Sequence, residues 1–151
     1  MEISGRKIQK GNAFIVAEIS ANHSKDFNIV MKTIEAAVES GADAIKLQTY
    51  NENTMTINCN KDDFLIKNGL WKGYTLFELY KEAHTPFEWH KDLFNYAKEI
   101  GITIFSSPFD ESAVDLLESL NTPAYKIASF EICDIPLIRY IASKRKPMLI
   151  S

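Results

Sequence analysis

Several features that would assign this chain to a particular class are scarce or missing. Its only two cysteines, Cys59 and Cys133, lie far apart and outside any CxxC pattern, which favours two reduced thiols in a cytoplasmic protein. No apolar run approaches the length of a membrane span, and residues 1–11 lack the apolar core of a signal peptide. With 17 basic and 20 acidic residues and a formal net charge of -3, the chain lacks the excess of basic residues that is typical of proteins that bind nucleic acid. We therefore expect a cytoplasmic protein that binds neither nucleic acid nor membrane.

What the sequence does contain is a regular alternation of short apolar runs and helix-length segments. The 151 residues are 46% hydrophobic and 25% charged, a composition that can form the core of about one domain. Apolar runs begin near Phe14, Ala44, Ile102, Ala124 and Pro147, and amphipathic segments separate them. This order is typical of an α/β protein with a parallel sheet.

The segments between the runs carry helix signals at their ends. Asp26 can cap a helix that stops at Gly41. Thr85, Pro86 and Glu88 combine an N-cap, a proline at the first helical position and a capping-box glutamate. The apolar face of that second helix would consist of Trp89, Leu93, Tyr96 and Ile100. Two further helices are expected around residues 113–120 and 137–141.

The fifth apolar run, at residues 147–150, resembles an interior strand with no helix after it. A complete (β/α)8 barrel needs about 250 residues, whereas this chain supplies about five strands and four helices. We therefore expect residues 1–151 to be the N-terminal portion of a (β/α)8 TIM barrel, truncated before its later strands. The alternative is a complete small α/β domain with an open sheet.

One connection is much longer than the others. More than thirty residues separate Thr49 from Thr85, although such connections usually span about 2–6 residues. We expect a helical excursion that covers the barrel, with Leu76, Leu79 and Tyr80 as its packing face. A long loop at this end of a barrel is also where a substrate lid would lie, and both interpretations can hold together.

Polar and charged side chains follow each of the first four apolar runs. Because the carboxyl ends of parallel strands lie on one face, where ligands bind in such folds, the sequence predicts a site there. Adjacent strand residues point to opposite faces, so only one of Ser106 and Ser107 should reach it, and we favour Ser107. The clustered residues are Glu18, Asn22, His23, Lys46, Gln48, Ser106, Ser107, Lys126, Ser129 and Glu131.

Four motifs in this order resemble those of the sialic acid synthase family. They are AEISANH at 17–23, IKLQT at 45–49, FSSPFD at 105–110 and YKIASFE at 125–131. Enzymes of that family condense phosphoenolpyruvate with an N-acetylated sugar to make nonulosonic acids. Within the family, residues 18–23, 71–76 and 128–131 are most similar to the pseudaminic acid branch, since the sialic acid branch typically has glycine at the positions of Ser20 and Phe130.

The resemblance implies that different strand-end residues bind different parts of the substrates. Phosphoenolpyruvate carries a phosphate and a carboxylate, so its pocket needs fixed cations and hydroxyl donors. By resemblance, Lys126 and Ser129 would hold the phosphate, and Lys46 and Ser107 would hold the rest of that substrate. The alternative for both lysines is structural pairing with a glutamate.

The resemblance places Glu18 and Glu131 at the sugar, where each carboxylate would accept hydrogen bonds from hydroxyl groups and assist proton transfer. The alternative for each is pairing with a lysine. His23 could orient its loop or contact substrate, and both options stay open at this point. His84 and His90 flank a helix start, and we expect surface or capping roles for them.

The resemblance also implies parts that these residues do not supply. The family uses a divalent metal, manganese or magnesium, whose histidine ligands belong to later strands, so we expect no metal site within this chain. A C-terminal antifreeze-like domain and a homodimer are expected of the full-length enzyme, and the chain alone should be inactive. The branch implies a 2,4-diacetamido-trideoxyhexose as the sugar, whose condensation with phosphoenolpyruvate would release phosphate.

Other functions remain open from the sequence. An N-acetylneuraminate or legionaminate synthase would share these motifs. A 3-deoxy-sugar-acid synthase or a lysine aldolase would also use a barrel with lysines at its strand ends. A non-catalytic half-barrel fragment that binds an anion or a partner through its exposed edge is the remaining alternative.

Overall fold

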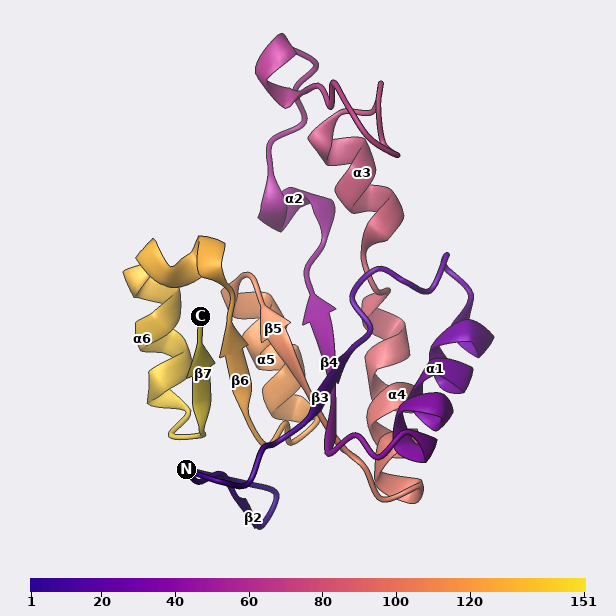
Figure 1. Ribbon diagram of the computed structural model, residues 1–151. Helices are drawn as coiled ribbons and strands as arrows, with labels where there is room; N and C mark the ends of the chain where they lie inside the picture. The colour runs from indigo at the N-terminus through magenta and orange to yellow at the C-terminus, as the bar shows by residue number, and fades with distance from the viewer.

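In the computed structural model, which describes residues 1–151, five parallel strands form one sheet in sequence order (Figure 1). The strands are β3 (Val16–Glu18), β4 (Ala44–Thr49), β5 (Thr103–Pro108), β6 (Tyr125–Ile127) and β7 (Met148–Ile150). The connections between them contain α1 (Phe27–Glu39), α4 (Phe87–Glu99), α5 (Glu111–Ser119) and α6 (Ile135–Ser143), and these helices cover one face. Sequential strand order with helices on one face is the arrangement of half a (β/α)8 barrel. The predicted fold is confirmed.

Each strand alternates between two apolar layers. On the outer face, which meets the helices, a large cluster includes Ile45, Leu47, Ile104 and Ile127 from the sheet. On the inner face, which points away from the helices, a smaller cluster contains Ala44, Phe105 and Ala124. The outer face holds the main core, and the inner face becomes polar toward the carboxyl ends of the strands.

Helix boundaries follow the predicted signals with one exception. Asp26 caps α1 by accepting the Asn28 N–H at 2.8 Å. The Thr85 capping box is wrong: α4 begins after Pro86 without any side-chain cap, because the Thr85 hydroxyl faces the His23 ring instead. The longest helices have 13 residues, and none is long and apolar enough to cross a membrane.

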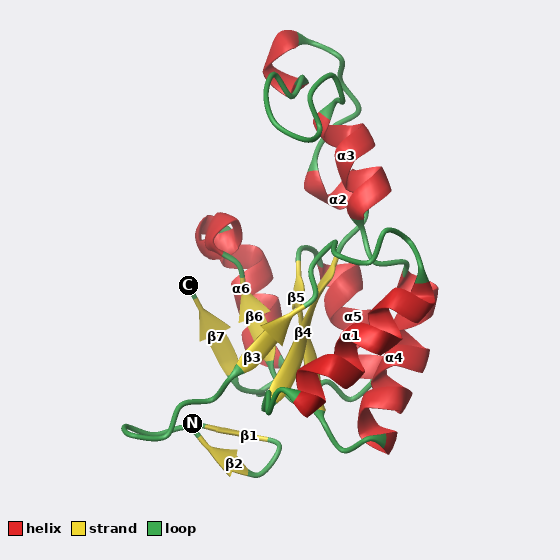
Figure 2. Cartoon of the chain, turned by 45° about the vertical axis from the view of Figure 1, so that its right-hand side comes forward, coloured by secondary structure: helices red, strands yellow, loops and turns green.

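A small hairpin that the sequence did not predict closes the amino ends of the strands (Figure 2). It consists of β1 (Glu2–Ile3) and β2 (Arg6–Lys7), which pair antiparallel. Ile3 is buried in the inner cluster beside Phe105 and Ala124. The otherwise polar N-terminal segment therefore contributes one apolar side chain that seals the inner layer.

The long connection contains helices, as predicted, but it does not cover the barrel. Its elements are α2 (Glu52–Met55), a 3-10 turn at Asp62–Phe64 and α3 (Leu76–Ala83), and together they project beyond the carboxyl ends of the strands (Figures 1 and 2). Leu76, Leu79 and Tyr80 are only half-buried. Tyr50 anchors the base of the segment through edge-to-face contacts with Tyr80 and Phe109, at ring distances of 5.7 and 5.4 Å.

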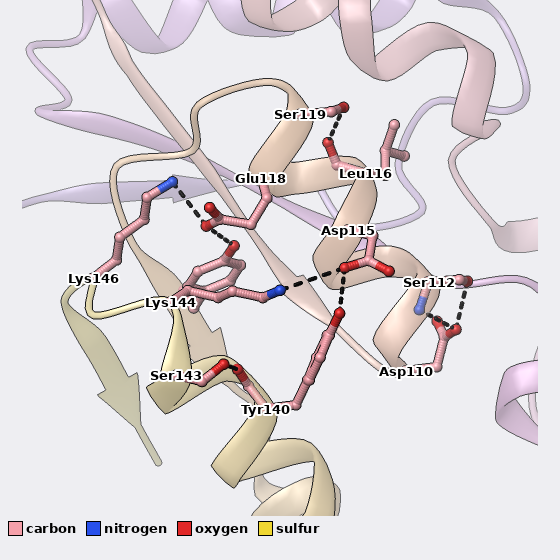
Figure 3. A network of polar contacts seen from close by, with 11 residues as sticks. Asp110, Ser112, Asp115, Leu116, Glu118, Ser119, Tyr140, Ser143, Lys144 and Lys146 are labelled. Carbon is pink, nitrogen blue, oxygen red and sulfur yellow. Dashed lines mark hydrogen bonds and ion pairs between the residues drawn. The ribbon is translucent and has the colours of Figure 1, made fainter.

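A polar network joins α5 to the segment that leads into β7 (Figure 3). The Tyr125 hydroxyl donates to Glu118 at 2.5 Å, and Lys146 lies 2.8 Å from the same carboxylate. One turn earlier in α5, Asp115 accepts the Tyr140 hydroxyl at 2.6 Å. Because β6 and β7 have only three residues each, these contacts add needed connections between the last strands and their covering helices.

Candidate functional site

Four of the predicted site residues lie on the inner face of the sheet, one on each of four neighbouring strands. Glu18 is aligned with Lys46 in the β3–β4 ladder, and Gln48 is aligned with Ser107 in the β4–β5 ladder. Lys126 in β6 lies on the same face, two positions after Ala124 of the inner cluster. Strand periodicity thus brings Glu18, Lys46, Ser107 and Lys126 together, as the sequence predicted.

Ser106 and Ser107 point to opposite faces, also as predicted. Ser107 shares the inner face with the lysines and is 2% exposed. Ser106 lies on the outer face, where its hydroxyl is 2.7 Å from that of Thr49. Only Ser107 can therefore serve the inner face.

Lys46 forms an ion pair with Glu18 across the β3–β4 ladder, so the structural pairing considered for this lysine is present. Burial, followed by the neighbouring ammonium of Lys126, lowers the pKa of Lys46 to about 8. The Glu18 carboxylate acts in the opposite direction, because it stabilises the charged amine. The Lys46 side chain is 17% exposed. A desolvated ammonium that lies near a second ammonium is an arrangement that binding of an anion would relieve.

Lys126 is held by oxygen atoms at the end of the sheet. Its Nζ donates to the Ile127 carbonyl at 2.5 Å and to the Ser151 hydroxyl at 2.6 Å. Burial lowers the pKa of Lys126, and the Glu131 carboxylate opposes that shift. No carboxylate forms a direct ion pair with Lys126 in the structure, which leaves its charge available to a ligand.

Glu131 and Ser129 lie in the 3-10 turn Ser129–Cys133 that follows β6. Glu131 Oε2 is buried without a hydrogen-bond partner. Burial raises the pKa of Glu131, Asp134 adds to the rise, and its own backbone N–H and Lys126 oppose it. Ser129 is exposed at the start of the turn and makes no hydrogen bond to Lys126. The turn therefore brings a carboxyl group toward Lys126, while the Ser129 hydroxyl stays separate from it.

The loop after β3 is held in place by Glu18 and His23. Glu18 Oε1 accepts the Ser20 N–H at 2.9 Å, and Ser20 adopts a left-handed backbone with a φ of 50°. His23 is 1% exposed, and its Nδ1 accepts the Lys25 N–H at 3.1 Å. Of the two roles left open for His23, orienting the loop is the one that these contacts support.

The surface or capping role expected for His90 is wrong. His90 is fully buried, with Nε2 2.9 Å from the Thr49 hydroxyl and Nδ1 3.0 Å from the Pro86 carbonyl. His84 agrees better with the expectation, because it follows the last turn of α3 and its Nδ1 lies 2.9 Å from the Lys81 carbonyl.

Two further residues lie on the inner face beside the predicted site residues. Gln48 was expected in the polar cluster but was given no role, although it lies two positions beyond Lys46 on the same strand face. Ser151 contacts Lys126 directly, but its position immediately after the three-residue β7 gave no comparable signal.

No group of three histidine, cysteine, aspartate or glutamate side chains lies close enough to hold a metal ion. The two cysteines are unpaired, as predicted. A hollow lies at the opposite end of the sheet, where Lys98, Thr103 and Asn121 contribute to its walls. It lies far from the polar strand ends, and we place the candidate site at those ends on the strength of the charged groups.

Comparison with known proteins identifies the relatives of this chain. Residues 33–151 match the model of the NeuB family. Pseudaminic acid synthases from Helicobacter pylori and from Campylobacter jejuni serotype O:2 are 52% and 49% identical to this chain over 137 and 138 residues. A diacetyllegionaminic acid synthase from Legionella pneumophila is 36% identical over 138 residues. These alignments cover 91% of this chain, and the chain spans about 40% of the length of the curated relatives it matches, in their N-terminal portion.

Solved structures of related proteins share the fold. The spore coat polysaccharide biosynthesis protein SpsE of Bacillus subtilis superposes with a TM-score of 0.76 at 31% identity, covering 99% of this chain and 39% of that protein. The N-acetylneuraminic acid synthetase of Leptospira borgpetersenii, determined in complex with citrate, also gives 0.76, at 26% identity, covering 96% and 49%. Sequence motifs, strand order and similarity over most of its length together show that this chain belongs to the NeuB family.

Proposed function

We propose that this chain forms the phosphoenolpyruvate-binding half of the active site of a pseudaminic acid synthase. The observation that carries the proposal is the pair of lysines on the inner face of the sheet, Lys46 in the middle of β4 and Lys126 in the short strand β6. The Lys126 ammonium disfavours the charge on Lys46, and a ligand that carries both a phosphate and a carboxylate would neutralise the two amines. Phosphoenolpyruvate has that pair of anionic groups.

In the proposed reaction, C3 of phosphoenolpyruvate attacks the aldehyde carbon of an open-chain 2,4-diacetamido-trideoxyhexose. A carbon–carbon bond forms, water adds at C2, and phosphate leaves. Lys126 would hold the phosphate, while Lys46 and Ser107 would hold the remainder of the substrate. The family resemblance also assigns Ser129 to the phosphate, and its exposed hydroxyl would have to turn toward Lys126 to take that part. The fixed charges need little rearrangement on binding, because strand pairing already sets their spacing.

The two glutamates would serve the sugar and the proton transfers. The new alkoxide needs a proton, and the attacking water must lose one. Glu131, whose pKa is raised by burial, is suited to donating a proton. Glu18 is ionised beside Lys46 and is suited to accepting hydrogen bonds from sugar hydroxyls.

The proposal includes the divalent metal, manganese or magnesium, that the family resemblance implies. The residues of this chain do not form a site for it, so its ligands would have to come from elsewhere in the full-length protein, and we assign no step to it here. A homodimer of the full-length protein and a cytoplasmic location remain predictions. Inactivity of the 151-residue chain alone is likewise a prediction, which a phosphate-release assay on that chain would test.

Titration of the chain with phosphoenolpyruvate, followed by calorimetry, tests the anion site directly. We expect binding that Lys126→Ala weakens by at least about tenfold, because a charge-assisted contact to the phosphate is lost. Lys98→Ala, which removes an exposed lysine at the end of α4, is the matched control and should leave affinity unchanged. In the full-length protein, phosphate release from phosphoenolpyruvate plus the diacetamido sugar should collapse in Lys126→Ala. Retained activity in that variant would refute the assignment.

The choice of sugar needs its own comparison. The full-length protein should release phosphate faster with the 2,4-diacetamido-trideoxyhexose that leads to pseudaminic acid than with N-acetylmannosamine or the legionaminic acid precursor. A preference for either of the other two sugars would assign the protein to the corresponding branch.

A lysine aldolase is the second candidate, because the pKa of Lys46 is lowered to about 8. A lowered pKa makes more free amine available to attack a carbonyl group. Borohydride reduction in the presence of pyruvate would trap a Schiff base on Lys46 or Lys126, detectable by mass spectrometry. A trapped adduct would favour the aldolase over the synthase.

A further inference from the structure

A chain of buried polar side chains lies on the outer face of the sheet, directly behind the candidate site. The Ser106 hydroxyl is 2.7 Å from the Thr49 hydroxyl, which is 2.9 Å from His90 Nε2. All three residues have no measurable exposure. A polar group this deep in an apolar layer destabilises the fold unless it is hydrogen-bonded, and here every member has a partner.

The direction of each hydrogen bond in this chain follows from its end at Pro86. A carbonyl oxygen only accepts, so His90 Nδ1, 3.0 Å from the Pro86 oxygen, must carry the proton. Burial is the main cause that lowers the pKa of His90, and the nearby His84 lowers it further. The Pro86 and Phe87 backbone groups and the Glu88 carboxylate act in the opposite direction, but the pKa remains below its ordinary value. The ring is therefore neutral near pH 7, and Nε2 is a bare acceptor. It follows that Thr49 donates to His90 and that Ser106 donates to Thr49.

His23 has the opposite tautomer on the same side of the molecule. Its Nδ1 accepts the Lys25 N–H, so Nε2 carries the proton and donates to the Thr85 hydroxyl at 3.3 Å. The two rings therefore fix the start of α4 from two directions, one through Thr85 and one through Pro86. This leaves His90 as the ring that connects α4 to the strands of the site.

The position of the Thr49–Ser106 hydrogen bond relates it to the anion site. In the β4–β5 ladder, Leu47 is aligned with Ser106 and Gln48 with Ser107. The Thr49–Ser106 hydrogen bond therefore links β4 and β5 on their outer faces. Gln48 and Ser107, the sequence neighbours of Thr49 and Ser106, face inward at the same height in the sheet. Any change in the length of the hydrogen bond would shift the backbone that carries those two side chains.

From this geometry we propose that His90 is a positioning residue, which acts through Thr49 and Ser106 to hold Gln48 and Ser107 in register for the anionic substrate. The inference rests on the proposed function for its ligand. His90 lies on helix α4, away from the ligand and outside the predicted site. In this proposal it nevertheless controls the spacing between the ends of β4 and β5. His90 itself does not touch the substrate.

The test compares matched valine substitutions of two buried threonines. Thr49→Val removes the central hydroxyl with little change in shape. Thr122→Val is the control, because Thr122 is also fully buried and donates to the Ala124 carbonyl at 2.9 Å, but at the amino end of β6. We expect Thr49→Val to weaken phosphoenolpyruvate binding about five- to tenfold and Thr122→Val to change it less than twofold. Equal effects of the two substitutions would overturn the proposal.

A second pair of variants addresses His90. In His90→Gln, the side-chain oxygen can occupy the place of Nε2 and accept from Thr49, whereas His90→Leu fills the space without an acceptor. We expect the glutamine variant to keep affinity within about threefold of the original and the leucine variant to resemble Thr49→Val. Affinity that is the same in both variants would contradict a role through hydrogen bonding.

Nuclear magnetic resonance separates this inference from the proposed function. The imidazole nitrogen signals should show His90 protonated at Nδ1 and bare at Nε2, with His23 reversed. Thr49→Val should shift the backbone amide signals of Gln48 and Ser107 more than Thr122→Val does, with no ligand present. If phosphoenolpyruvate does not bind the original chain, the proposed function fails while these signals still decide the positioning role. Unmoved Gln48 and Ser107 signals would refute it.

Discussion

Replacement of Lys46 by methionine should stabilise the chain while it abolishes anion binding. The ordinary pKa of a lysine is 10.5, and burial with the charge of Lys126 lowers that of Lys46 to about 8. That difference corresponds to about 3 kcal/mol for keeping the amine charged at neutral pH. The Lys46 side chain keeps some contact with water, and its ion pair with Glu18 offsets part of this cost. Loss of the partner of Glu18 reduces the gain further, although the 34% exposed Glu18 side chain can turn to water. We therefore expect Lys46→Met to raise the free energy of unfolding by at most about 1 kcal/mol at pH 7.

The pH dependence provides the sharper part of this prediction. Between about pH 8 and pH 10.5 the folded state binds fewer protons at Lys46 than the unfolded state does. The stability of the original chain should therefore rise with pH across this window, and the advantage of Lys46→Met should shrink. Below about pH 8 both states hold the proton, so the full advantage is present there.

Urea denaturation followed by circular dichroism at pH 7 and pH 10 measures both effects. Lys98→Met, which removes an exposed charge from α4, controls for the change in net charge. Other groups titrate at high pH, so the informative quantity is the difference between each variant and the original chain. The reasoning would be refuted if Lys46→Met lowered the free energy of unfolding by more than about 1 kcal/mol at pH 7. It would also be refuted if the difference in free energy of unfolding between Lys46→Met and the original chain were the same at both pH values.

Three further outcomes are expected. Glu131→Gln should stabilise the chain against urea at pH 7 and less so at acid pH, because burial raises the pKa of Glu131 and ionisation of the partnerless carboxyl therefore opposes folding; a loss of stability would argue for an unseen partner. Tyr125→Phe should lower the free energy of unfolding by about 1–2 kcal/mol, since the buried hydrogen bond to Glu118 is lost, and a thermal melt that does not change would contradict this. The chain should self-associate through the free edges of β3 and β7, and a monomer at all concentrations in sedimentation velocity would exclude such pairing.

The parts of the fold that the sequence predicted are those set by local periodicity. Alternation along β4 and β5 separates Lys46 from Leu47 and Ser107 from Ser106, because a strand can present its residues only in this way. The cap at Asp26 was predicted for a similar reason, since its partner Asn28 is two residues away. Such contacts need no knowledge of the tertiary structure.

The errors involve side chains whose partners are distant in sequence. The Thr85 hydroxyl could cap α4, but it meets His23, 62 residues earlier, and the distant partner prevails. His90 falls on the buried side of α4 and finds Thr49 41 residues away. Periodicity indicates that such a residue is buried but does not name its partner. The same limit hid the contact between Lys126 and Ser151.

The hairpin at the amino ends of the strands has a consequence for the order in which this chain folds. Ile3 packs in a layer that also contains Phe105, Ala124 and, at its margin, Leu149, all of which lie far later in the sequence. The outer layer can assemble step by step, because each strand meets the helix beside it in sequence. The inner layer requires segments far apart in sequence to meet, and contacts over such separations form slowly. The surface that carries the lysines therefore depends on the slowest contacts of this fold.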